Sequence, residues 1–361
     1  MPSPDAPPTL SERIEAASAR VLDRLPRRVK VLLSGEPPVV VDGQTLDPQV
    51  QLIRATRLRR RVPALCEPDV VAARARYRRD GIVFRGTPPA MRSVRDLAVG
   101  GAEGPLPARL YVPHIEVRPT ALLVYLHGGG FVIGDLETHD PVCRILAHRS
   151  GARLLAVDYR LSPEHPHPAA PLDAIAATRW AGAHAAELGV AAGRIAVGGD
   201  SAGGNLAIVV AQEESRAGRR PLLQLLIYPA TDASRARPSR VLFGDGAFFL
   251  TARDEDDFMR HYIQRSGVSP LDPWVSPLLA SDHRGSPPAI VATAGFDVLR
   301  DQGTAYADAL EAAGVPTVRC HFATLPHGFL HMTGVSRSSR EAVESIADAL
   351  RQALDTGEKA A

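Results

Sequence analysis

The chain has little cysteine and no long hydrophobic run. Its three cysteines, Cys66, Cys143 and Cys320, are odd in number and widely spaced, which argues against a disulfide framework and against paired-cysteine zinc sites. The longest apolar runs, such as 222–227, have the length of a strand and fall far below a membrane span. The start of the chain has no basic segment followed by an apolar one. We therefore expect no secretory signal and a cytoplasmic location.

An excess of charge of one sign is also missing. The 42 basic and 40 acidic residues leave a formal net charge of +2, which argues against nucleic acid as a partner. Only two basic residues are lysines, Lys30 and Lys359, as in chains from GC-rich bacterial genomes. Two arginine-rich stretches, 54–61 and 74–79, are interpreted as solvated helix faces, with peripheral contact to anionic lipid as the alternative.

Apolar runs separated by helical stretches dominate the chain after residue 85. The Pro-rich residues 1–8 are predicted to be disordered, and 10–79 to form helices broken by turns. Predicted strands lie at 94–99, 108–112, 121–126, 154–158, 195–198, 222–228, 289–293 and 317–322. Helical patterns lie near 140–148, 174–187, 205–214, 302–313 and 340–354. This alternation predicts an α/β fold with a mostly parallel sheet, and an antiparallel hairpin at one edge from the first two runs.

The segment Gly199-Asp200-Ser201-Ala202-Gly203 matches the pattern G-x-S-x-G. A predicted strand leads into it and a predicted helix leaves it, which is the context of a strained turn that exposes the serine hydroxyl. A glycine-rich turn with an incidental serine is the plain alternative. A phosphate-binding loop is disfavoured because no Gly-Lys-Ser/Thr follows. The context predicts that Ser201 is a nucleophile.

A second glycine-rich segment, 127–131, follows the predicted strand 121–126. Glycines let backbone N–H groups approach a developing oxyanion closely. We expect an oxyanion hole formed by the N–H groups of Gly128, Gly129 and Ala202. A dinucleotide-binding loop is excluded by spacing, because the required third glycine is replaced by Ile133.

A serine nucleophile needs a histidine base, and the histidine needs an acid that orients it. His327 lies in a loop after the last predicted strand, where it can reach over the carboxyl edge of a sheet. His331 is a less favoured neighbour, and His321 falls inside the strand. For the acid we favour Asp297, which follows strand 289–293, over Asp301, whose position suits a helix cap.

Six motifs together resemble the hormone-sensitive-lipase-like esterases, also called bacterial family IV. They are HGGGF at 127–131, DYRLSPE at 158–164, GDSAGGN at 199–205, YP at 228–229, DVLRD at 297–301 and HGF at 327–329. The resemblance implies the α/β-hydrolase fold and a triad on Ser201, Asp297 and His327. It also implies a helical cap built from N-terminal helices and from the insertion before the acid.

These patterns together predict an α/β-hydrolase fold with an eight-stranded, mostly parallel sheet, helices on both faces and a helical cap. We expect an N-terminal cap segment at 1–85 and a catalytic domain at 86–361, with a cap insertion at about 235–267. His165 and His167 suggest a metal, but no third ligand is apparent, so we expect no metal and no cofactor.

The predicted function is hydrolysis of short-to-medium acyl esters, with a small-molecule ester as the partner. The same triad also serves amide and lactone hydrolases, and the sequence does not separate them. Receptor proteins of plants resemble this family but lack the histidine, so the presence of His327 disfavours a binding protein. The oligomeric state, a homodimer included, is left open.

Overall fold

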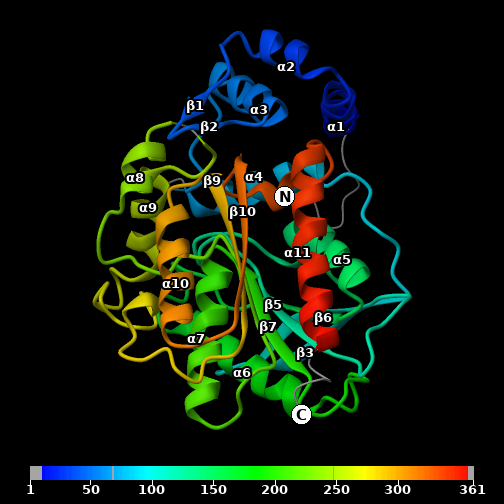
Figure 1. The fold of residues 1–361 in the computed structure, drawn as a ribbon, viewed down its shortest axis with the longest axis vertical. Helices are drawn as coiled ribbons and strands as arrows, with labels where there is room; N and C mark the ends of the chain where they lie inside the picture. The colour runs from blue at the N-terminus through cyan, green and yellow to red at the C-terminus, as the bar shows by residue number, and fades with distance from the viewer. Residues whose placement is uncertain (1–9, 67–68, 247, 357–361) are drawn as a thin grey trace.

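A twisted eight-stranded sheet forms the centre of the molecule (Figure 1). The structure, a computed structural model, describes residues 10–66, 69–246 and 248–356, so the segment predicted to be disordered lies outside the described residues. The strand order is β10-β9-β8-β7-β5-β6-β4-β3. The strands are Ser93–Gly100 (β3), Pro105–Val112 (β4), Leu122–Leu126 (β5), Arg153–Val157 (β6), Ile195–Asp200 (β7), Gln224–Ile227 (β8), Ala289–Phe296 (β9) and Thr317–Pro326 (β10).

Each strand of this sheet matches one of the predicted runs, and the predicted edge hairpin is β3 paired with β4. Strand β4 is also antiparallel to β6, whereas all other neighbours in the sheet are parallel. All eight residues of β9 and all five of β5 are buried. Such continuous apolar runs are typical of parallel strands that are covered on both faces.

Helices cover both faces of the sheet, and the sheet separates the hydrophobic core into two clusters. On one face, α5 (Leu136–Ser150) and α11 (Arg337–Thr356) pack against each other and against the sheet. On the other face lie α6 (Ala169–Ala183), α7 (Ala202–Arg216) and α10 (Arg300–Ala312). Side chains alternate along β5, so that Tyr125 enters the first cluster and Val124 the second. The predicted fold class is confirmed.

The residues before β3 form helices, of which the first three lie beyond the upper ends of β9 and β10 in Figure 1 and the fourth lies level with these strand ends. They are α1 (Leu10–Asp23), α2 (Arg27–Ser34), α3 (Pro48–Arg59) and α4 (Val70–Phe84). The N–H of Asp47 donates to the carbonyl oxygen of Thr324 at 2.9 Å, which attaches this segment to β10. The two short strands Val40–Val41 (β1) and Gln44–Thr45 (β2) were not predicted. Their turn is Asp42-Gly43, with positive φ at both residues, which is the sequence signature of a tight hairpin.

The insertion between β8 and β9 contains the helices α8 (Pro238–Phe243) and α9 (Ala252–Tyr262), followed by the 3-10 helix η1 (Pro277–Leu279); another, η2 (Phe329–Met332), follows β10. A capping box between Thr251 and Asp254 starts α9. Asp254 also accepts a hydrogen bond from the backbone N–H of Cys66 at 3.1 Å, which joins the insertion to the N-terminal segment. Within the described part of the chain, the structure contains no helix with the length and apolar character to cross a membrane.

Candidate active site

Ser201 stands in a sharp turn between β7 and α7. Its backbone has φ of 54° and ψ of −118°, a conformation that is strained for a residue with a side chain. The turn requires glycine on both sides. A Cβ atom at Gly203 would lie 1.9 Å from the carbonyl oxygen of Leu126, and one at Gly199 would lie 2.3 Å from the same oxygen. The motif therefore folds as the pattern predicted, with the hydroxyl at the carboxyl end of the strand.

The structure brings Ser201, His327 and Asp297 together from three different segments. The Oγ atom of Ser201 is 3.0 Å from Nε2 of His327, and Nδ1 of His327 is 2.8 Å from Oδ2 of Asp297. The other carboxylate oxygen of Asp297 accepts the N–H of Leu299 at 2.8 Å. Because Asp297 is only 1% exposed, this carboxylate is shielded from water and held at both oxygens.

The less favoured candidates have other partners. Asp301 accepts hydrogen bonds from the N–H of Ser239 at 2.8 Å and from Nε of Arg300 at 3.0 Å. His331 bonds the hydroxyl of Tyr77 through Nε2 at 2.7 Å, and His321 bonds Thr293 through Nδ1 at 2.9 Å. None of these hydrogen bonds involves Ser201 or His327.

The loop after β5 carries the glycines expected to bind an oxyanion, and their N–H groups differ in whether they already have a hydrogen-bond partner. The N–H of Gly128 donates to Oδ1 of Asp200 at 3.0 Å, so it is already engaged, contrary to its expected role as a donor. The N–H groups of Gly129, Gly130 and Ala202 have no backbone partner among the described residues. These three residues line the cavity in front of Ser201. The available donors are therefore Gly129, Gly130 and Ala202.

A buried polar network holds Asp200, the residue before the nucleophile. Its Oδ1 accepts the Tyr125 hydroxyl at 2.8 Å in addition to Gly128, and it lies 3.3 Å from Nε2 of His139. Burial alone would raise the pKa of Asp200, but the charge of the adjacent His139 and the hydrogen bond from the Tyr125 hydroxyl keep the pKa below its ordinary value. Asp200 therefore stays ionised and fixes the glycine loop through Gly128. Sequence reasoning missed this network, because nothing local to Asp200 indicates it.

The same network is the one cluster of metal-ligand type found in the described ranges. Ligand atoms of His139, Asp200 and His331 lie within 4.8 Å of one another. Hydrogen bonds already engage Asp200 and His331, and burial lowers the pKa of His331 to about 3, so His331 is neutral. We interpret the cluster as a hydrogen-bond network. His165 is exposed, and His167 packs edge-on against Tyr262 at 5.4 Å.

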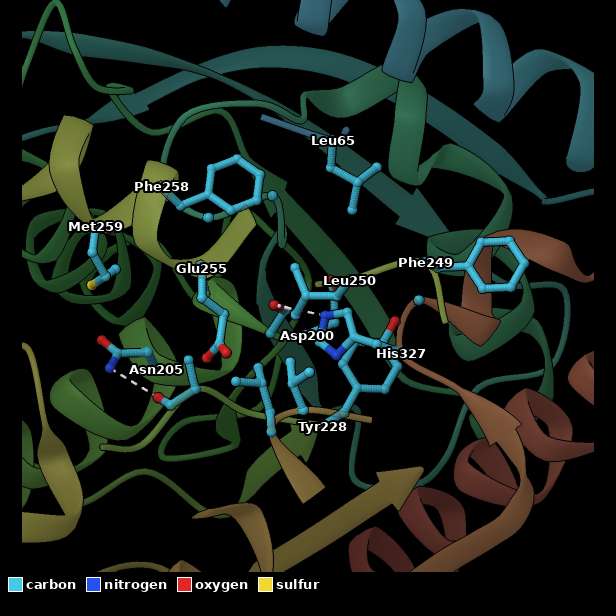
Figure 2. A pocket seen from close by; sticks show the side chains of 18 of the residues that line it. Leu65, Asp200, Asn205, Tyr228, Phe249, Leu250, Glu255, Phe258, Met259 and His327 are labelled. Carbon is cyan, nitrogen blue, oxygen red and sulfur yellow. Dashed lines mark hydrogen bonds between the residues drawn. The ribbon is translucent and has the colours of Figure 1, made fainter. Parts of the chain in front are cut away.

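A cavity of about 370 Å³ lies in front of Ser201 and His327 (Figure 2). Its apolar wall comes from two parts of the chain that are distant in sequence. The N-terminal segment contributes Leu65, Tyr77 and Phe84, and the insertion contributes Phe249, Leu250, Phe258 and Met259. Phe248, by contrast, does not line the cavity, because it packs against Phe243 and Phe296 in the core.

Comparison with known proteins places this site in a family. Residues 123–331 match the model of a family described by the alpha/beta hydrolase fold. Carboxylic ester hydrolase LipN of Mycobacterium tuberculosis is 44% identical over 342 residues, which is 93% of this chain and 90% of that protein. Ethyl acetate hydrolase of Pseudomonas putida is 37% identical, over 84% of this chain and 97% of that protein.

A solved structure gives the same result. Ester-hydrolase EH1AB1 from the metagenome of Lake Arreo, complexed with a derivative of bipyridine phosphonate, aligns with a TM-score of 0.79 and 40% identity. The alignment covers 84% of this chain and 96% of that one. The chain belongs to the hormone-sensitive-lipase-like family of the α/β-hydrolase fold, an enzyme family of carboxylesterases and lipases.

Proposed function

We propose that this enzyme hydrolyses carboxylic esters of short-to-medium acyl length through an acyl-enzyme on Ser201. The observation that carries the proposal is the continuous chain of hydrogen bonds from Ser201 through His327 to the buried Asp297. His327 takes the proton of the Ser201 hydroxyl as the oxygen attacks the ester carbonyl, and then gives it to the departing alcohol. Asp297 holds the imidazole in the tautomer whose Nε2 can accept a proton. A water molecule, activated by His327, then releases the acid and restores Ser201.

The oxyanion of each tetrahedral intermediate is bound, in this proposal, by the N–H groups of Gly129, Gly130 and Ala202. The first two lie on the glycine loop and the third at the start of α7, where the helix dipole also favours negative charge. Gly128 acts indirectly, because its bond to Asp200 fixes the loop. Preorganised donors of this kind stabilise charge that develops only during the reaction.

Substrate selection is assigned to the cap, formed by the N-terminal segment 1–85 and the insertion 235–267 over the catalytic domain 86–361. The support is the cavity, whose apolar wall comes from both cap parts while its floor contains Ser201 and His327. A cavity of about 370 Å³ has the size of a site for a small ester, which supports short-to-medium acyl groups in this proposal. The substrate is accordingly a small-molecule ester.

A chromogenic ester tests the proposal. The wild-type protein should hydrolyse p-nitrophenyl butyrate and release a burst of nitrophenol equal to the enzyme concentration when deacylation is slower than acylation. Ser201→Ala should lower turnover to the background rate. Wild-type protein that leaves this ester and its acetate and hexanoate analogues intact would contradict the proposal.

A further inference from the structure

Glu255 is an acidic side chain that α9 places in the cavity, on the same helix as the apolar lining residues Phe258 and Met259 (Figure 2). It lies one turn before Phe258, and its side chain is 18% exposed. One carboxylate oxygen, Oε2, accepts a hydrogen bond from Nε of Arg240 at 3.1 Å. The other, Oε1, has no hydrogen-bond partner among the residues that the structure describes. A carboxylate in this setting has one acceptor oxygen without a protein partner, on a side chain that lines the cavity.

The charge of Glu255 is only partly balanced. Arg240 also binds Asp256 at 2.6 Å, so that one guanidinium serves two carboxylates and the group carries a net negative charge. The Asp256 side chain is 67% exposed, so solvent screens its charge more strongly than that of the largely buried Glu255. Burial, opposed by Arg240 and reinforced by Asp297, raises the pKa of Glu255 to about 7. A buried carboxylate with a free oxygen gains most from a partner that donates hydrogen bonds or carries positive charge.

From this geometry we infer that Glu255 is a specificity-determining residue that favours esters bearing a cationic or hydrogen-bond-donating group over uncharged esters of the same shape. The inference rests on the proposed ester hydrolysis at Ser201. The cation lies against the free Oε1 while the ester carbonyl lies at Ser201. Glu255 takes no part in bond breaking, so its effect is on the relative kcat/KM of two substrates.

Matched esters measure this preference. In the first pair, butyrylcholine has a quaternary nitrogen in its alcohol where 3,3-dimethylbutyl butyrate has a carbon. In the second pair, ethyl 4-(trimethylammonio)butyrate has the quaternary nitrogen in its acyl chain where ethyl 5,5-dimethylhexanoate has a carbon. The ratio of kcat/KM for the cationic to the neutral ester is the readout. We expect Glu255→Gln to lower this ratio about 5- to 10-fold in one of the two pairs, the size expected for a partly solvated charge pair.

Asp256→Asn is the matched control, because it removes the same unit of charge from the same arginine at an exposed position. It should change the ratio less than about twofold, since solvent screens an exposed charge. If both substitutions change the ratio equally, the preference comes from the overall negative charge of this part of the cap and not from Glu255, which would overturn the inference. So would a ratio that Glu255→Gln leaves unchanged in both pairs.

The pH dependence of the ratio provides a second readout that loss of structure would not reproduce. The ionised form of Glu255 binds the cation, so the ratio should be high at pH 8.5 and fall as the pH drops through about 7. The groups with the largest effect on Glu255 are Arg240, Asp297 and His327, with Asp256 beyond Arg240. Other charged side chains line the same cavity, including Arg57, Asp80, Asp232, Arg235 and Arg237. Titration of His327 affects both esters alike and cancels in the ratio. Hydrolysis of the neutral esters with a pH-independent ratio would refute this inference alone, whereas a wild-type protein that leaves p-nitrophenyl acetate, butyrate and hexanoate intact would refute the proposed function.

Discussion

Replacing Asp297 by asparagine should disturb the orientation and tautomer of His327 and leave the rest of the site unchanged. In the structure, Oδ1 of Asp297 accepts the N–H of Leu299 at 2.8 Å, and Oδ2 faces Nδ1 of His327 at 2.8 Å. An asparagine keeps the first bond only by turning its carbonyl oxygen toward Leu299. Its amide NH₂ must then face Nδ1, which favours the tautomer that carries its proton on Nε2. That tautomer cannot accept the proton of Ser201.

The expected loss in kcat is about 10³- to 10⁴-fold, as when a triad loses its orienting carboxylate. This equals about 4 to 5.5 kcal/mol of transition-state stabilisation. Because the bond to Leu299 persists, the thermal unfolding midpoint should change little. The assay is the steady-state hydrolysis of p-nitrophenyl butyrate, with Asp301→Asn as the control, since Asp301 bonds Ser239 and Arg300 instead. A larger loss from Asp301→Asn than from Asp297→Asn would refute the reasoning.

Four further substitutions test the loop, the turn and the cavity. Gly130 has φ of 61°, and a Cβ atom there would lie 2.2 Å from the Phe258 ring. Gly130→Ala should therefore displace the loop and lower kcat by about 10²- to 10³-fold, the effect of losing an oxyanion donor. An unchanged kcat would exclude this loop conformation. Gly203→Ala places a methyl group against the backbone oxygen of Leu126 and should lower the free energy of unfolding by at least about 2 kcal/mol in urea denaturation. An unchanged free energy of unfolding would contradict the close packing of Gly203 against Leu126. Phe249→Ala should shift the preferred acyl length upward, because Phe249 lines the cavity. Phe248→Ala should instead lower the free energy of unfolding by about 3 kcal/mol and leave the preferred acyl length unchanged, because Phe248 packs in the core. A shift in acyl length from Phe248→Ala and none from Phe249→Ala would refute the assignment of the cavity wall.

The turn around Ser201 could be predicted because its requirements are local. Glycines at 199 and 203 leave the space that the turn needs, and the strand before it and the helix after it are visible in the hydrophobic pattern. The meeting of Asp297 and His327 could be predicted for a different reason. Both follow parallel strands, β9 and β10, whose carboxyl ends lie side by side at one edge of the sheet.

The features that escaped prediction depend on contacts between distant segments. Gly128 was expected to bind the oxyanion, but its N–H is held by Asp200, and only the folded loop shows which glycines are left. His139 and His331 lie on α5 and η2, and nothing in the sequence indicates that both approach Asp200. The apolar wall of the cavity likewise combines Leu65 with residues of the insertion.

The central claim is that Ser201 forms a covalent bond during catalysis, and mass spectrometry of the labelled protein tests it most directly. A serine-directed organophosphorus reagent should add one group to the intact wild-type protein and abolish its activity. Peptide analysis should place that group on Ser201, and Ser201→Ala should remain unlabelled under the same conditions. Labelling that persists undiminished in Ser201→Ala would contradict the account.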